Sequence, residues 1–429
     1  MKSIEELHHE ANNLRQAKKY VDAIPLYEKL WTETGDQYDG AGLLHCLRKS
    51  GDFEKAIPLA GELIKKYPTF DWTKNESIWT LINGKLIKLN ENSSLEDVLA
   101  VASEIMNLKP EGLAAKKVVF KVLKSAKAAD KWDIVSEWAD KLDPETLSTT
   151  PMTDARGREG WSDQSLWYNY KYNSLIEQNK SEEVLQCIDQ IIERFPKQRK
   201  FFLRLKALAL HKTEKLAKAE ECYKELCNVR NPDWWLLHEY ARVINAQGEK
   251  KAALKLMCQA ANSNTKLELM VTLFHEMGLL FKEIGEKEIA RAHFVLSSLI
   301  RQEHGWSIPR IISDSMTELN KEIGNEDIPT SIKDAISLCR KEWENIIGIS
   351  SISIQRKPKR GLIGRVQLGS SERPFCFILG DRKESFFCFK SDLPADIRDG
   401  DIVSFTALPS FDRKKNCESW KAINIKIST

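Results

Sequence analysis

The spacing of hydrophobic and polar positions divides the chain into two regions. Up to about residue 347 the apolar residues recur at helical spacing, interrupted only by short breaks. The basic segment Gln355–Gly361 ends this pattern, because Pro358 opposes a continuing helix. Short alternating runs bounded by Gly, Asp and Pro follow, and they predict five strands at residues 362–368, 374–379, 385–390, 401–408 and 421–427. The pattern predicts a long helical region followed by a small β-barrel.

An internal repeat runs through the helical region. A break with Gly, Asn or Asp precedes an aromatic or apolar residue, and an Ala follows three residues later. Clear copies place this alanine at Ala23, Ala56, Ala219, Ala253 and Ala290. Neighbouring copies are 33, 34 and 37 residues apart. A small residue at this position lets two antiparallel helices approach closely, and the spacing predicts about eight helical hairpins.

This pattern resembles the tetratricopeptide repeat, whose period is about 34 residues. The resemblance covers roughly residues 4–300 and implies an α-solenoid, with the helices of residues 301–347 capping its end. It also implies an unidentified protein partner in the solenoid groove. The family's clamp for a C-terminal carboxylate uses Lys and Asn, whereas His8, Asn12 and Gly42 stand at those places here. That mode of peptide binding is therefore not supported.

The β region resembles a cold-shock domain, which is an oligonucleotide-binding barrel. Five motifs match in order, at Gly364–Val366, Arg373–Ile378, Ser385–Phe389, Gly400–Phe405 and Ala422–Ile425. The resemblance implies binding of single-stranded nucleic acid, RNA more than DNA, by stacking of bases on exposed rings. The residues that it assigns to this site are Arg365, Arg373, Phe375, Phe377, Lys383, Phe386, Cys388, Phe389, Arg413 and Lys414.

The chain departs from the cold-shock pattern at several aromatic and glycine positions. Leu368 and Gly369 replace the aromatic pair of the first strand, and Cys388 replaces a histidine. Pro374 and Cys376 replace two glycines. These departures imply weaker binding than that of a stand-alone cold-shock protein, or binding that needs another component. The alternative is that the phenylalanines are ordinary core residues or dock onto the helical array.

The alternation of side chains along a strand predicts which rings are exposed. We expect Phe375 and Phe377 to share one face, and Cys376 to lie on the other. Phe386 is expected on the exposed side with Phe375, and Phe387 is expected to point the opposite way. This assignment makes Phe375 and Phe386 the predicted stacking pair.

Charge and composition agree with a two-part protein. Residues 350–429 contain 15 Lys and Arg against 9 Asp and Glu, a net charge of +6 within a chain whose net charge is +3. A basic C-terminal region suggests a polyanionic partner. The nine cysteines form no CxxC pair, which predicts free thiols in a reducing cytoplasm rather than a zinc site or disulfide framework.

No catalytic motif is present in the sequence. It has no Gly-rich phosphate loop, HExxH or GxSxG motif, and we expect no enzyme activity, cofactor or metal. The start of the chain lacks the apolar core of a signal peptide, and no stretch is long and apolar enough for a membrane helix. We therefore expect a cytoplasmic protein without a membrane partner.

The predicted organisation is a mainly α protein in three parts. Residues 1–348 form the repeat solenoid with its capping helices, 349–361 a basic linker, and 362–429 the barrel. The predicted function is that of a non-enzymatic adaptor between single-stranded nucleic acid and a protein. The alternative is a pure protein-interaction scaffold whose barrel no longer binds nucleic acid. Residues 149–164 interrupt the repeats. This segment is either a long connection between repeats or a functional loop.

Overall fold

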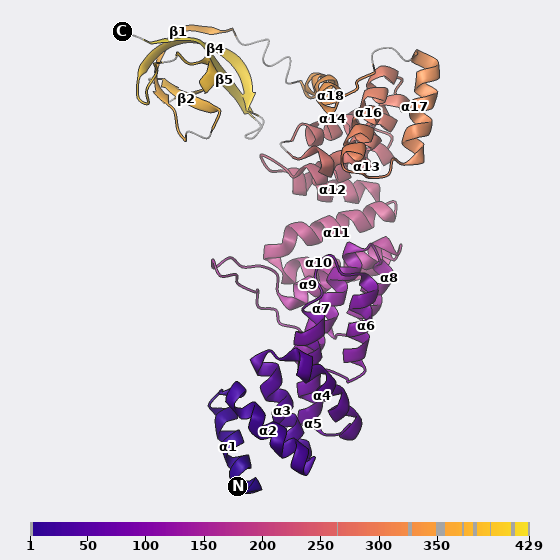
Figure 1. Cartoon of the computed structure of the whole chain (residues 1–429). Helices are drawn as coiled ribbons and strands as arrows, with labels where there is room; N and C mark the ends of the chain where they lie inside the picture. The colour runs from indigo at the N-terminus through magenta and orange to yellow at the C-terminus, as the bar shows by residue number, and fades with distance from the viewer. Residues whose placement is uncertain are drawn as a thin grey trace. The chain divides into compact units, whose positions relative to one another are not determined.

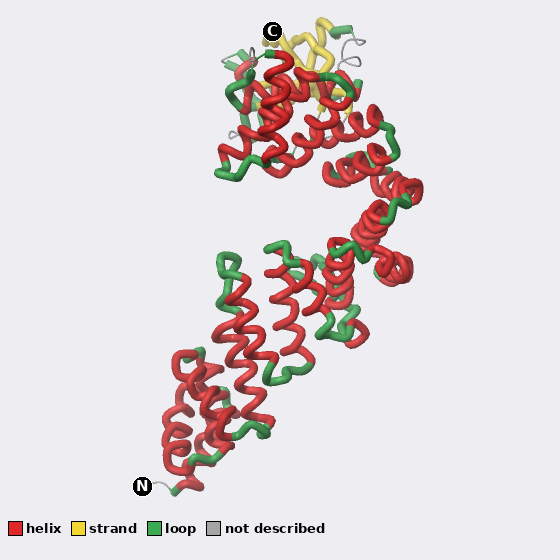
Figure 2. Tube along the Cα trace, turned by 90° about the vertical axis from the view of Figure 1, so that its right-hand side faces the viewer, coloured by secondary structure: helices red, strands yellow, loops and turns green. Residues whose placement is uncertain are grey.

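The computed structural model describes residues 3–263, 265–324, 328–348, 357–370, 373–380, 384–394, 396–412 and 417–427. These residues contain 18 α-helices followed by five β-strands. Most of the helices are labelled in Figure 1, and Figure 2 shows the strands together near the C-terminus. Contacts divide the chain into two compact units, Met1–Leu205 and Lys206–Thr429. The predicted fold class, a mainly α helical-repeat protein with a five-stranded barrel, is confirmed.

The first unit consists of helices that pack against their neighbours in the sequence. Its helices are α1 (Ile4–Gln16), α2 (Tyr20–Thr34), α3 (Gln37–Ser50), α4 (Phe53–Lys66), α5 (Asp71–Leu81), α6 (Leu95–Met106), α7 (Gly112–Ala128), α8 (Trp132–Ala139), α9 (Asp163–Glu177) and α10 (Ser181–Arg194). A π-helical turn, Ile82–Leu86, extends α5. Helix α11 (Arg199–Lys212) contains the boundary between the two units.

The second unit continues the same arrangement of helices before the strands begin. Its helices are α12 (Leu216–Cys227), α13 (Trp234–Ala246), α14 (Lys250–Ala261), α15 (Val271–Glu283), α16 (Lys287–Glu303), α17 (Arg310–Ile323) and α18 (Ile332–Ile347). Helix α17 packs on α16, while α18 packs on both α14 and α16.

The alanines of the repeat pattern occupy the contacts between helices. Ala23, Ala56, Ala219, Ala253 and Ala290 are all fully buried, each with 0% of its surface exposed. Close approach extends to Gly42 of α3, where an added β-carbon would come within 2.4 Å of the Tyr27 ring of α2. The small residues of the repeat therefore mark places where one helix lies directly against the next.

Helix α18 is fixed to the second unit by a buried aromatic group. The Trp343 ring stacks on Phe274 at 5.7 Å between centroids, and its indole N–H donates to Nε2 of His293 at 2.8 Å. His293 in turn donates from Nδ1 to the carbonyl of Ile289 at 2.8 Å, so the imidazole is the neutral Nδ1–H tautomer. Burial lowers the pKa of His293 to about 4, because its charged form would lose hydration.

The five strands form a closed barrel in the order β1-β2-β3-β5-β4. They are β1 (Lys359–Gln367), β2 (Phe375–Gly380), β3 (Ser385–Phe389), β4 (Ile402–Asp412) and β5 (Cys417–Ile427). Neighbouring strands are antiparallel except for β3 and β5, which pair in parallel. The interior includes Val366, Ile378 and Phe405, all almost completely buried.

Strand β1 begins earlier than the first predicted strand. It starts at Lys359, within the segment 349–361 that we predicted as a linker, of which residues 349–356 lie outside the described part. The pairing of β1 with β4 shifts between Lys359 and Leu362, and Gly361 adopts a positive φ of 67° there. A glycine in this conformation is typical of a β-bulge, which lets the strand continue past an irregular residue.

Candidate nucleic-acid interface

The pairing of β2 with β3 decides which side chains face outward. Cys376 lies opposite Cys388, and Phe377 lies opposite Phe387. Residues directly opposite each other in an antiparallel pair point to the same face of the sheet. Four phenylalanines, at positions 375, 377, 387 and 389, therefore share one face of the two strands. The residues between them share the other face.

The inner face of the two strands is completely enclosed. Ile378 has 0% of its surface exposed and Phe386 has 1%, and the Phe386 ring meets Phe405 edge-on at 4.9 Å. The thiols of Cys376 and Cys388 also point inward, and their sulfur atoms are 3.0 Å apart. Burial raises the pKa of the Cys388 thiol, and the neighbouring Cys376 raises it further. This thiol is therefore a neutral core group rather than a nucleophile.

The outer face carries a continuous group of rings, which we call the phenylalanine platform (Phe375, Phe377, Phe387 and Phe389). Phe387 is its centre, with ring centroids 5.6 Å from Phe375, 6.1 Å from Phe377 and 5.1 Å from Phe389. Phe377 and Phe389 have 36% and 41% of their surface exposed. Large rings that remain this exposed on adjacent strands offer flat apolar surfaces to a ligand.

Polar side chains border the platform on both sides. The Lys421 ammonium of β5 lies 4.9 Å from the centre of the Phe389 ring, and the Cα of Lys421 pairs with that of Phe387. On the other side, β1 places Gln367 opposite Phe377. Arg365 is exposed two residues earlier on the same face of β1. The rings are thus flanked by hydrogen-bonding and positively charged groups.

Two residues of the predicted site lie on the inner face of β3 rather than on its outer face. Phe386 and Cys388 were predicted to bind nucleic acid, but both are buried inside the barrel. Phe387, predicted to point inward, belongs instead to the outer platform. The motif alignment is therefore displaced by one residue in β3, and a shift of one residue exchanges the two faces of a strand.

The remaining predicted residues are outward or lie outside the described part of the chain. Phe375, Phe377, Phe389 and Arg365 share the outer face, and Arg373 is exposed in the turn before β2. Lys383, Arg413 and Lys414 lie outside the described residues. Phe387 and Lys421 were not among the predicted site residues. Alternation along β5 from the buried Ala422 would have identified Lys421 as outward-facing.

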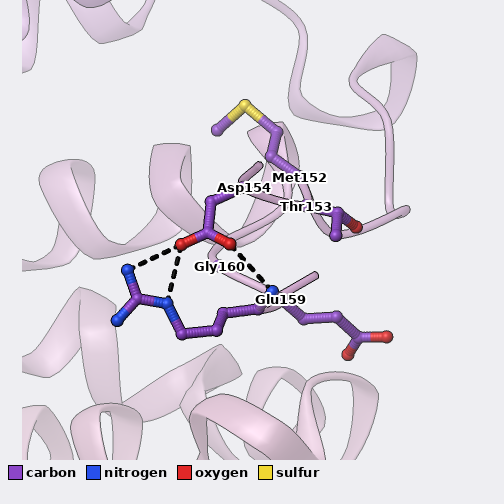
Figure 3. A pocket seen from close by; sticks show the side chains of 6 residues that line it. Met152, Thr153, Asp154, Glu159 and Gly160 are labelled. Atoms are coloured by element: carbon purple, nitrogen blue, oxygen red, sulfur yellow. Dashed lines mark hydrogen bonds and ion pairs between the residues drawn. The ribbon is translucent and has the colours of Figure 1, made fainter. Parts of the chain in front are cut away.

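The interruption at residues 149–164 contains a hairpin-like turn whose residues 152–160 are exposed. Thr153 and Glu159 pair as an antiparallel bridge, and the turn contains a shallow pocket of about 490 Å³, drawn in Figure 3. The Asp154 carboxylate accepts hydrogen bonds from the backbone and side chain of Arg158 and from the backbone of Arg156. These bonds lower the pKa of Asp154 and occupy its oxygens, as expected of a structured connection.

The described residues lack two features. They contain no group of three or more His, Cys, Asp or Glu side chains arranged to hold a metal ion. Among the helices described, none is both long enough and apolar enough to cross a membrane.

Comparison with known proteins does not give a family for the chain. The model of DUF7017, a domain of unknown function, matches residues 200–322, which is less than a third of the chain. No curated protein matches the sequence. A tetratricopeptide repeat protein from Parabacteroides merdae is 13% identical, with 65% of this chain and 98% of that chain covered and a TM-score of 0.31. The Cut9–Hcn1 hetero-tetramer of the APC/C is 11% identical, with 83% and 91% covered and a TM-score of 0.24.

Proposed function

We propose that the chain is a non-enzymatic adaptor whose barrel binds single-stranded nucleic acid, RNA in preference to DNA, while its helical repeats bind a protein. The phenylalanine platform carries this proposal. Four rings on two neighbouring strands would be unfavourable on a surface that contacts only water. Stacking of unpaired bases on such rings contributes about 1–3 kcal/mol per base, and it depends little on base identity.

The charges around the platform suit a phosphate backbone. Arg365 and Lys421 border the rings on β1 and β5, and Arg373 precedes β2. Each lysine or arginine that contacts a phosphate displaces bound counterions, so affinity falls as the salt concentration rises. The resemblance to a cold-shock domain supports the same ligand, with Phe387 taking the role first assigned to Phe386.

A matched pair of variants tests the proposal. Phe387→Ala removes the central ring of the platform, whereas Phe386→Ala removes its buried neighbour. Loss of one stacked base would weaken binding of a labelled single-stranded RNA by about five- to 150-fold in the first variant, with the barrel still folded. The second variant should unfold the barrel, because deletion of a buried phenylalanine costs about 3–5 kcal/mol. Fluorescence anisotropy measures binding, and circular dichroism measures folding.

The alternative is a pure protein-interaction scaffold whose barrel no longer binds nucleic acid. The missing first-strand aromatics favour it, because Gln367 is the β1 residue opposite Phe377 on the outer face. If wild-type protein and Phe387→Ala bind RNA equally weakly at low salt, the nucleic-acid proposal is wrong and the scaffold function replaces it. A DNA strand of the same sequence, measured in parallel, tests the preference for RNA.

A further inference from the structure

Helix α7 of the first unit has an unusual charge distribution. Its 17 residues, Gly112–Ala128, include five lysines and no acidic residue. Val118, Val122 and Leu123 of this helix are fully buried. The lysines therefore lie along the part of the helix that faces away from the core, and they share it with Phe120.

Three of the five lysines have oxygen partners. Lys116 pairs with Asp163 of α9, Lys121 donates to the carbonyl of Leu89, and Lys124 lies 3.2 Å from Glu91. The Lys124 pair is highly exposed, so it contributes little to stability.

The other two lysines, Lys117 and Lys127, lie over aromatic rings instead. The Lys117 ammonium is 5.8 Å from the centre of the Trp79 ring of α5, and the Lys127 ammonium is 5.7 Å from that of Tyr170 of α9. Neither has a carboxylate within ion-pair distance among the described residues. A ring face attracts a cation weakly, by about 0.5–1 kcal/mol at an exposed site, and leaves its charge uncompensated.

More positive charge lies close to Lys127. Partial burial, and then the positive charge of Arg204, lowers the pKa of this ammonium. The Phe120 ring lies 6.4 Å from Tyr170 and continues the apolar surface between the two lysines. The faces of α5, α7 and α9 thus combine partly exposed rings with two ammonium groups that, within the described part of the chain, have no negative partner.

We propose that this surface binds an acidic, extended segment of a partner protein, with one carboxylate on Lys117 and another on Lys127. The inference deepens the proposed protein-binding role of the helical repeats, and it does not depend on nucleic-acid binding by the barrel. A peptide fits better than a nucleic acid, because only two ammonium groups of the described α7 surface lack a negative partner and they are ten residues apart, whereas a nucleic-acid strand carries a phosphate on every nucleotide.

The spacing of the lysines specifies the partner further. Lys117 and Lys127 are ten residues apart on α7, which is about 15 Å along a helix axis at about 1.5 Å per residue. An extended chain covers that distance in about four to five residues, at about 3.3 Å each. Because side chains alternate between the two faces of an extended chain, the partner should carry two acidic residues about four positions apart, with apolar side chains between them to contact Phe120.

The test uses full-length protein and a labelled peptide of about 15 residues, with glutamates about four positions apart in a background of Gly, Ser and Leu. Lys117→Gln with Lys127→Gln should weaken its binding about tenfold, since each surface ion pair contributes up to about fivefold. The control is Lys49→Gln with Lys65→Gln, which changes the net charge equally at exposed positions of α3 and α4.

The outcomes separate specific binding from general attraction. Retained binding in the control, together with lost binding in the α7 variant, supports the proposal. Equal loss in both variants, or equal wild-type affinity for a peptide with glutamine in place of glutamate, overturns it. The proposal also fails if single-stranded RNA binds wild-type protein and is lost specifically in the α7 variant. Phe387→Ala should leave peptide binding unchanged, so failure of the barrel's proposed function would be distinguishable.

Discussion

This molecule has two aromatic clusters, one among the helices of the second unit and one on the barrel. They are built from similar rings but differ in how far those rings are exposed. The Trp343 cluster is closed, since its ring stacks on Phe274 and its only polar atom donates to His293. The phenylalanine platform is open, with Phe377 and Phe389 more than a third exposed. The first cluster has every polar group paired, whereas the second presents apolar rings beside positive charge.

The difference separates packing from recognition. A buried ring beside satisfied hydrogen bonds is explained by folding alone. An exposed group of rings is not explained by folding alone, because burying these rings would be more favourable than leaving them in water. Variants in the first cluster should therefore change stability, and variants in the second should change binding.

The largest expected effect is on Trp343. Trp343→Ala should lower the free energy of unfolding of the helical part of the second unit by about 3–5 kcal/mol, because it leaves a large cavity and an unpaired His293. Phe377→Ala on the platform should change stability by less than about 1 kcal/mol. Urea unfolding followed by circular dichroism measures both. Similar losses in the two variants would remove the distinction between the clusters.

A smaller effect is expected from acidification, through His293. Its pKa is about 4 in the folded chain, against 6.5 for an exposed histidine of the unfolded chain, so folding excludes a proton that the unfolded chain binds. The contribution of neutral His293 to the free energy of unfolding is therefore fully present above pH 6.5. As the pH falls from about 6.5 to about 4, about 3 kcal/mol of this free energy is lost.

His293→Gln provides the control for this pH dependence. An amide can donate to the Ile289 carbonyl and accept from the Trp343 indole, but it does not titrate. The variant should therefore lose much less stability than the wild type between pH 7 and pH 4.5. Parallel pH profiles for the two proteins would mean that His293 is not the titrating group.

The smallest expected effect is at the edge of the platform. Lys421→Met keeps the length of the side chain but removes its charge from the Phe389 ring. RNA affinity should fall by about two- to fivefold, the size of an exposed cation–ring contact or one phosphate contact. The dependence of affinity on salt should also become shallower. An unchanged salt dependence would show that Lys421 does not contact phosphate.

Much of the fold was predictable because its signals are redundant. The repeat alanines combine period, flanking apolar residues and preceding turns, and every one of the five is buried. The barrel strands are each bounded by turn residues, and all five are present, with β1 beginning earlier and β4 and β5 longer than predicted. Several independent features of the sequence indicated each of these elements.

The assignment of faces in β3 failed because its sequence carries no clear alternation. Phe386 and Phe387 are the same residue type, so either could be the inward one, and Cys388 fits a core or a site equally well. Only the pairing of β3 with β2 decides between them, and this pairing depends on contacts distant in sequence. The α7 surface was also missed, because its rings come from three different helices.

The position of β5 in the barrel has a consequence for how the chain folds. β5 lies between β3 and β4, so the barrel cannot close until Ile427 has been added to the growing chain. The helical hairpins need only near neighbours in sequence, and they can pack as they emerge during synthesis. Until β5 is available, β1 to β4 can pair only as an open sheet, and translation that stops before Cys417 would leave β3 and β4 as open edges prone to aggregation.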